Sequence, residues 1–433
     1  MHDVLDIRDL VVDEVEQLIV SGFDVADLEH RARAAALAGA TTELETIYSE
    51  LDVCRRLPSW AFDEPDDDAS LDALADRAEH RRVDRSRLPG KLRGAWTGRA
   101  VGNTIGKPIE GLSRSEVEIY LRAGDAWPVR DYLPLVHPLP DGVSILHPSA
   151  PVSTRGTFDA APRDDDIDWT IVALHVVEKY GRDVSTDQIA REWLDRVPFT
   201  QTYTAERAAY RNLIHGMIPP LTATFRNPYR EWIGALIRGD AFGYVNPGDP
   251  GAAARLALKD ARLSHTGNGI FGEVWAAALC AAALAECDMA EVYESGLSVV
   301  PEGSRLAIAL RSIRELHHEG RSWAQALDWI DTELGQYPWV HTINNAAQIA
   351  TGLLWGSSFI DAIHITVAGG RDTDSNAATV GSVWGALHGI EAIPGDLVGS
   401  THTRVRSAVR DFDRVSIDDL VTRTLTLIEG KTA

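Results

Sequence analysis

The chain contains few cysteines and no long hydrophobic run. Only three of its 433 residues are cysteines, and no CxxC pair occurs, which excludes a disulfide framework for a chain of this length and fits a reducing compartment. The longest apolar run, about residues 274–285, is too short to span a bilayer. The N-terminus shows no basic segment followed by an apolar one, so no secretory signal is visible. We therefore expect a cytoplasmic protein that does not insert into membranes.

Basic residues are outnumbered. Lys and Arg total 42 against 64 Asp and Glu, for a formal net charge of −22. An acidic surface repels phosphate backbones and anionic lipids, which argues against nucleic acid as the main partner and against docking on a membrane. A phosphorylated small molecule remains possible, because a local metal site can override the global charge.

The length favours two or three structural units. Residues 1–85 are acidic, and their apolar residues recur at helical spacing in three stretches, which predicts three amphipathic helices. The acidic run at 64–68 is typical of a solvated linker. We predict residues 1–85 as a helical extension and 86–433 as a second, larger domain. The extension could cover the domain, mediate oligomers or bind a partner.

The second region is predicted to be all-α, because helical spacing dominates and alternating strand patterns are nearly absent. Residues 127–162 are rich in Pro, His and Gly, and they predict a long loop that forms a pocket rim or lid. The predicted helices cover residues 167–180, 185–194, 205–216, 232–238, 251–263, 268–287, 304–318, 323–334, 344–354, 375–389 and 417–429.

Four glycines, Gly94, Gly98, Gly102 and Gly106, recur at intervals of four residues. On a helix they share one face, where another backbone or a ligand can approach closely. Because glycine weakens a helix, the stripe indicates that close approach is needed there. Glu110 follows the stripe and, taken alone, is typical of a surface glutamate.

Two acidic clusters lie far apart in the sequence. Residues 164–166 are three consecutive aspartates at the start of an apolar helix; a solvent-facing helix N-cap explains this run if it is taken alone. Asp372 and Asp374 follow two glycines and precede Ser375. This oxygen-rich set suits hard cations such as Mg²⁺, Mn²⁺ or Ca²⁺, with a plain helix cap as the alternative. Polar clusters at 265–269 and 341–345 also open helices.

Taken in order, residues 94–111, 164–170, 264–277 and 369–389 resemble the ADP-ribosylglycohydrolase family, which includes dinitrogenase-reductase-activating glycohydrolase. The most specific pieces are Asp165-Asp166 and the segment 370–378. The resemblance covers about residues 88–430. It implies an all-α orthogonal multi-helix bundle with two divalent cations, Mg²⁺ or Mn²⁺, in a central cleft. It also implies hydrolysis of a ribosyl N- or O-glycosidic bond in an ADP-ribosylated substrate or an ADP-ribose derivative.

The resemblance also implies roles for individual residues. Glu110 matches the family's glutamate beside the metals, so we predict that it orients or deprotonates the attacking water, with Asp166 as the competing candidate. The implied metal ligands are Asp164, Asp165, Asp166, Asp372, Asp374 and Ser375. The predicted substrate-binding residues are Gly102, Asn103, Gly106, Asn268, Gly269, His341 and Asn344; backbone amides near 102–106 or 268–269 would meet the diphosphate.

Two departures leave alternatives open. The family commonly has a hydroxyl residue just before the Asp pair and a threonine just after it, where this chain has Asp164 and Ile167. A hydrolase of a nucleoside-like riboside is therefore one alternative. A non-catalytic metal-binding relative is another, because the family includes a structural lens crystallin. A two-metal phosphohydrolase is disfavoured, because neither acidic cluster contains a histidine.

Overall fold

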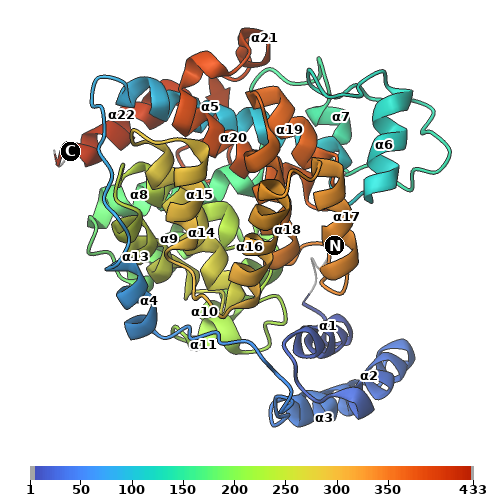
Figure 1. Ribbon diagram of the computed structural model, residues 1–433. Coiled ribbons are helices and arrows are strands. Elements are labelled where there is room, and N and C mark those ends of the chain that lie inside the picture. Colours follow the sequence, from blue (N-terminus) through green and yellow to red (C-terminus); the bar gives the residue numbers. More distant parts are fainter. Residues whose placement is uncertain (1–4, 431–433) are drawn as a thin grey trace.

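The computed structural model describes residues 5–430, and helices account for nearly all of its regular structure (Figure 1). The described residues form twenty-two α-helices and one short antiparallel pair of strands, β1 (Arg404–Val405) and β2 (Val415–Ser416). This confirms the all-α prediction. None of the described helices combines the length and the apolarity that a bilayer span requires. The first four residues of predicted region 1–85 and the last three of region 86–433 lie outside the described residues.

The N-terminal extension contains the three predicted helices, α1 (Ile7–Val20), α2 (Ala26–Ala38) and α3 (Thr41–Leu51). They project from the body at the lower right of Figure 1. Val11 and Ile47 are fully buried in a small core that also includes Tyr229 and Trp232 of the body. The extension therefore packs against the body through its own apolar face.

The acidic run at 64–68 is not the solvated linker that its composition predicts. Asp67 and Asp68 are exposed, but the Glu64 side chain is only 5% exposed and pairs with Arg305 at 2.8 Å. Asp66 accepts a hydrogen bond from the backbone N–H of Gly267. The prediction fails because residues some 200 positions further along the chain supply the partners for these two carboxylates. Helix α4 (Asp68–Ala75) follows directly.

The glycine stripe lies on α5 (Leu88–Gly106), where this helix crosses α20 (Thr373–His388). A Cβ on Gly98 would lie 2.1 Å from the carbonyl oxygen of Gly381, and a Cβ on Gly381 would lie 2.1 Å from that of Gly98. Larger residues would force the helices apart. This crossing places the end of α5 beside the start of α20; Glu110 lies four residues after α5, and Asp372 is the N-cap of α20.

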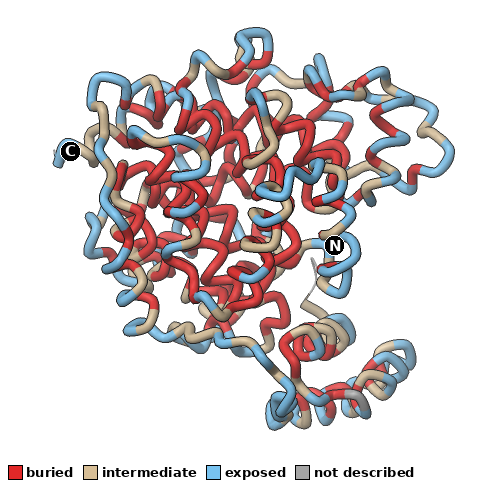
Figure 2. Tube along the Cα trace, viewed as in Figure 1, coloured by how far each residue is buried: buried red, intermediate tan, exposed pale blue. Residues whose placement is uncertain are grey.

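Apart from α20, the helices that follow α5 are, in chain order, α6 (Arg114–Ala123), α7 (Ala150–Ser153), α8 (Asp165–Tyr180), α9 (Thr186–Arg196), α10 (Thr204–Ile214), α11 (Leu221–Thr224), α12 (Asp240–Tyr244), α13 (Pro250–Ala261), α14 (Asn268–Ala283), α15 (Met289–Leu297), α16 (Arg305–His318), α17 (Trp323–Glu333), α18 (Thr342–Trp355), α19 (Phe359–Val367), α21 (Gly395–Val398) and α22 (Ile417–Ile428). Six of them, α8, α14, α18, α19, α21 and α22, pack directly on the pair of α5 and α20. The rest complete the body, whose interior is filled by buried residues (Figure 2). The short 3-10 helices are η1 (Lys107–Ile109), η2 (Phe199–Gln201), η3 (Leu236–Arg238) and η4 (Ile390–Ala392).

Ten of the eleven helices predicted in the second region occur with shifted ends; the exception is 232–238. Only its last three residues form a helix, the 3-10 turn η3. The backbone N–H of Ile233 is bonded instead to the carbonyl of Val340, and Trp232 forms an isolated bridge with His341. A long-range backbone contact thus replaces the local helix that the apolar spacing predicts.

Candidate active site

The loop before α20 binds the segment after η1. Gly370 and Arg371 both have left-handed backbone angles, with φ of +68° and +63°. This turn lets the N–H of Arg371 donate to the carbonyl of Leu112 at 2.8 Å, while the N–H of Gly111 donates to the carbonyl of Arg371 at 2.9 Å. Two backbone bonds therefore fix Glu110, one residue before Gly111, beside the start of α20.

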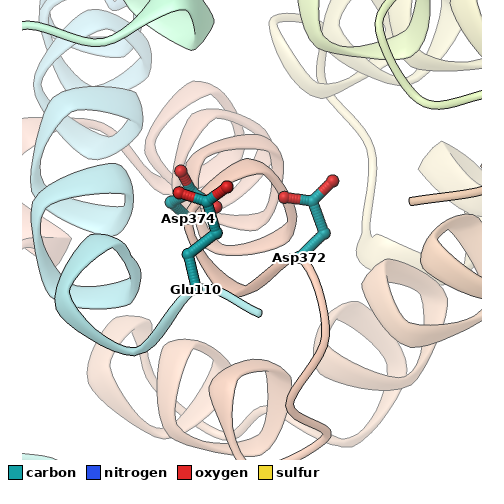
Figure 3. Close-up of side chains that lie close together, drawn as sticks. All are labelled: Glu110, Asp372 and Asp374. Carbon is teal, nitrogen blue, oxygen red and sulfur yellow. The ribbon is translucent and has the colours of Figure 1, made fainter. Parts of the chain in front are cut away.

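The first carboxylate cluster consists of Glu110, Asp372 and Asp374, each with an oxygen atom within 4.8 Å of the other two (Figure 3). Both aspartates are buried, and the Glu110 side chain is 20% exposed. The sequence predicts Glu110 and these aspartates as parts of one site, and the fold brings them together.

The second cluster, Asp164, Asp165 and Asp166, has the same compactness, again within 4.8 Å. Asp164 caps α8 by accepting a hydrogen bond from the N–H of Asp165 at 3.0 Å. The positive end of the helix dipole offsets part of the repulsion among the three. Ser375 Oγ donates to Asp166 Oδ2 at 3.3 Å and so joins the two clusters.

Burial and mutual repulsion shift the pKa values of acids in both clusters. Burial raises the pKa of Glu110 to about 8, opposed by the Lys107 ammonium and reinforced by the Asp372 carboxylate. Burial, with the Asp164 carboxylate adding to it, raises the pKa of Asp166 to about 7. For Asp165, Asp372 and Asp374 burial and neighbouring carboxylates also raise the pKa well above its usual range. These acids cannot all ionise at neutral pH without added positive charge.

The donor set fits a divalent cation. Asp166 Oδ1 and Asp374 Oδ1 are buried, and neither has a hydrogen-bond partner among the described residues. An unpaired buried carboxylate oxygen costs free energy, and a cation removes that cost. All candidate ligand atoms are oxygens, which suits Mg²⁺ or Mn²⁺.

Two buried cations that the sequence analysis did not identify lie at this site. Lys107 Nζ is 2.6 Å from Asp164 Oδ2 and 3.9 Å from Asp374 Oδ2. Arg99 donates to the backbone carbonyl of Asp166 at 3.0 Å and to Asp240 at 2.6 Å. The sequence signal for Lys107 was the surplus aspartate at 164, because a buried extra carboxylate requires a positive partner.

A histidine from the 127–162 loop also reaches the site. His147 Nε2 lies 3.3 Å from Glu110 Oε2, and the N–H of His147 donates to the carbonyl of Pro108. The loop thus contributes to the edge of the site, as its length and position predicted. The particular residue could not be chosen from sequence, because the loop lacks a periodic pattern that would orient its side chains.

Of the predicted substrate-binding residues, Asn103 lies at the acidic clusters. Its Nδ2 donates to Asp164 Oδ2 at 2.7 Å, and its buried Oδ1 has no partner among the described residues. Gly102 and Gly106 face α20 instead: a Cβ would lie 2.0 Å from the carbonyl oxygen of Ala377 and 2.2 Å from that of Thr373, respectively. Both glycines serve the helix crossing, and a direct substrate contact for them stays a prediction.

The start of α14 is occupied by the protein's own carboxylates. The N–H of Asn268 donates to Glu231 at 2.9 Å, and that of Gly267 donates to Asp66 at 2.9 Å. The Asn268 side chain bonds both Glu64 and Glu231. A Cβ on Gly269 would lie 2.4 Å from the carbonyl of Arg230. A diphosphate contact at Asn268 or Gly269 stays a prediction, and in this conformation these carboxylates would have to give way to it.

His341 and Asn344 cap the start of α18. His341 Nδ1 accepts from the N–H of Ile343, and its Nε2 lies 3.7 Å from Glu231. Asn344 donates to the carbonyl of Pro338 at 3.0 Å. The neighbouring Asn345 accepts a hydrogen bond from Asn376 of α20 at 2.8 Å. This bond links the start of α18 to α20. Substrate contacts for His341 and Asn344 stay predictions.

Comparison with known proteins identifies the family. The ADP-ribosylglycohydrolase family model matches residues 84–430, so the chain belongs to the ADP-ribosylglycohydrolase family. None of the curated proteins matches the chain. A solved structure described as an "ADP-ribosylglycohydrolase-related protein complex" is similar at 19% sequence identity, covering 80% of this chain and 100% of its own, with a TM-score of 0.45. The assignment rests on the family model.

Proposed function

We propose that this protein is a divalent-cation-dependent hydrolase that cleaves the ribosyl N- or O-glycosidic bond of an ADP-ribosylated substrate or an ADP-ribose derivative. Family membership supports the glycohydrolase class. The observation that carries the proposal is the convergence of two carboxylate clusters from segments about 200 residues apart, linked by Lys107 and Ser375, with buried oxygens that lack hydrogen-bond partners among the described residues. Burying so many acids together lowers the stability of the fold, and such a cluster is typical of a site where the acids take part in chemistry or bind a cation.

The residues that would hold the cation are Asp166, Asp372, Asp374 and Ser375, with Asp165 beside them. When bound, a divalent cation supplies Lewis-acid polarisation of an oxygen and a fixed charge against which a sugar is oriented. Glu110 would orient a water molecule and take its proton as the oxygen bonds to C1 of the ribose, while the departing atom leaves with the bonding electron pair. Asp166 is the competing base.

The same carboxylates would favour the transition state. Glycosidic cleavage passes through a state with positive charge on the ribose ring, and nearby carboxylates stabilise that charge. The His147 loop beside Glu110 would shield the reacting atoms from bulk water. Asn103, whose buried Oδ1 has no hydrogen-bond partner among the described residues, would accept a hydrogen bond from a ribose hydroxyl.

The test is a substrate panel with the purified protein and either Mg²⁺ or Mn²⁺. The panel contains ADP-ribosyl-arginine, an ADP-ribosyl-serine peptide, ADP-ribose-1″-phosphate, NAD and several nucleosides, and mass spectrometry detects released ADP-ribose or ribose. Asp372→Ala combined with Asp374→Ala, and EDTA, should abolish release. Asp328→Ala removes a carboxylate that is 67% exposed on α17 and should leave release unchanged.

Each result has a definite meaning. Release that requires the cation and both aspartates supports the proposal, and the member that turns over identifies the leaving group. Turnover of nucleosides alone would replace the ADP-ribose assignment with a simpler riboside. Cation binding without turnover of any panel member would identify a non-catalytic relative.

A further inference from the structure

Lys107 is the one lysine that touches both carboxylate clusters among the described residues. Its side chain is 7% exposed, and its Nζ lies 2.6 Å from Asp164 Oδ2 in the second cluster and 3.9 Å from Asp374 Oδ2 in the first. An ammonium group that is buried between carboxylates stays charged, because their attraction outweighs the loss of hydration. The site therefore contains a permanent positive charge before any ion binds.

The Asp164 carboxylate is bonded to groups of the protein itself, among them the Lys107 ammonium. Its Oδ2 accepts from Lys107 and from Asn103 Nδ2 at 2.7 Å, and its Oδ1 accepts from the N–H of Asp165 at 3.0 Å. Both oxygens of Asp164 are thus already bonded within the protein. Asp164 Oδ2 is occupied by two donors, and the Lys107 ammonium already balances the charge of this carboxylate.

Four other residues at the meeting of the two clusters offer oxygens to an ion. Neither Asp166 Oδ1 nor Asp374 Oδ1 has a hydrogen-bond partner among the described residues, although the Arg99 guanidinium lies 3.7 Å from Asp166 Oδ1. Ser375 Oγ lies 3.3 Å from the other oxygen of Asp166, and Asp372 belongs to the same compact cluster as Asp374. These four residues supply one set of oxygen ligands.

We propose that the Lys107 ammonium occupies the role of one of the two divalent cations that the family resemblance implies, so that this chain binds one divalent cation. Lys107 balances Asp164 and the near oxygen of Asp374, and the ion is held by Asp166, Asp372, Asp374 and Ser375. This inference rests on the proposed cation site and deepens it, by naming the number of ions and the residue that sets it.

The test is the number of Mn²⁺ ions bound per chain, measured by titrating the metal-free protein and following free Mn²⁺ by electron paramagnetic resonance. The wild-type protein should bind one ion. Lys107→Met removes the ammonium at similar volume and should raise the number to two. Lys91→Met is the matched control: Lys91 is also buried on α5, but it donates to the carbonyls of Ala283 and Ala285. Lys91→Met changes the net charge by the same amount as Lys107→Met but at a different position. Its number of bound Mn²⁺ ions should therefore stay at one.

The outcomes are distinct from those of the substrate panel, because no turnover is needed. Two ions on the wild-type protein, or an unchanged single ion on Lys107→Met, would overturn the inference while leaving the hydrolase proposal intact. No bound ion on any variant would overturn both. If Lys107→Met does not fold, Lys107→Ser, which leaves room for water, takes its place. The wild-type count alone still decides between one ion and two.

Discussion

The imidazole of His147 is oriented toward the Glu110 carboxylate by a neighbouring serine. The N–H of Ser149 lies 3.3 Å from His147 Nδ1, and Ser149 Oγ lies 2.7 Å from the same nitrogen. A backbone N–H can only donate, so Nδ1 accepts and Nε2 carries the proton that faces Glu110 Oε2 at 3.3 Å. Burial, aided by the Lys107 ammonium, lowers the pKa of His147 to about 4. The imidazole is therefore neutral at pH 7 and acts as a hydrogen-bond donor.

We expect His147→Ala to lower kcat by roughly 10- to 100-fold, the usual effect of losing a group that orients an active-site residue. The value of KM should change little, because His147 touches the predicted base rather than the substrate. Ser149→Ala keeps the backbone donor and should cause a smaller loss. Steady-state kinetics on whichever panel substrate turns over measures both constants. An unchanged kcat in His147→Ala would mean that other contacts place Glu110.

The crossing of α5 and α20 predicts a sharp difference between two glycines of one helix. Gly98→Ala puts a methyl group where the nearest backbone atom is 2.1 Å away, so the helices must separate, at a cost of about 1–3 kcal/mol. Gly90→Ala meets only the end of the Glu391 side chain, at 3.9 Å. It should be neutral or stabilise the protein by up to about 1 kcal/mol, since alanine favours helix. Denaturant unfolding compares the two, and equal effects would contradict the packing explanation.

A buried ion-pair network attaches the N-terminal extension to the body. Arg305 contacts Glu64 at 2.8 Å, Glu231 at 2.7 Å and the carbonyl of Val20 at 2.8 Å. Gln17 of α1 donates to Glu231 at 2.7 Å. This network explains why the extension is fixed in place although the acidic composition of its linker predicts a solvated segment.

Arg305→Met leaves two buried carboxylates without their partner, so we expect a loss of about 3–5 kcal/mol in the free energy of unfolding. The extension should then be cleaved by protease faster than the body. Arg314→Met on the same helix removes a half-exposed pair with Glu294 and should cost at most about 1 kcal/mol. Limited proteolysis followed by mass spectrometry locates the cleavage. Equal resistance in both variants would show that the apolar contacts of α1–α3 suffice.

Much of the fold could be predicted from residue periodicity, because most helices carry an apolar face at regular spacing. The helix at 167–180 is an example, observed as Asp165–Tyr180. Helices α6 and α15 escaped prediction, although each starts with a capping box, Ser113 with Glu116 and Asp288 with Glu291. Those two local signals could have identified them. The failure at 232–238 is different in kind, because a distant strand-like contact decides the backbone there.

For the candidate site too, some features could be predicted from the sequence and others could not. Its acidic residues could be predicted because they form short motifs, and the fold brings both motifs together. The extra carboxylate of Asp164 indicated that a positive partner was needed, but nothing local identified Lys107 as that partner, since a lysine beside a proline has no feature that indicates burial. The start of α14 had the composition of a ligand site, but Asp66 and Glu231 bond its amides. Only the three-dimensional structure shows that those donors are already used.

The raised pKa values of Glu110 and Asp166 predict how stability depends on pH. Burial raises the pKa of Glu110 from 4.5 to about 8 and the pKa of Asp166 from 3.8 to about 7. An acid with a raised folded-state pKa binds its proton more tightly in the folded chain than in the unfolded chain. Its stabilisation is complete below the unfolded pKa and is lost as pH rises through the folded pKa. The metal-free protein should therefore lose thermal stability as pH rises from about 4 to about 8.

Divalent cations should reverse this trend, because they bind the ionised carboxylates. The rise in melting temperature on adding Mn²⁺ should increase from pH 5 to pH 8. Glu110→Gln and Asp166→Asn should each flatten the metal-free profile of melting temperature against pH.

Glu116 is a useful contrast, because hydrogen bonds from Ser113 and Ser144 lower its pKa to about 2. Its stabilisation is lost only below pH 4.5, so Glu116→Gln should leave the profile above that pH unchanged. Thermal melts in EDTA and in Mn²⁺ across this range measure each effect. A metal-free protein that becomes more stable toward pH 8 would mean that these carboxyls are ionised in the folded chain without a cation.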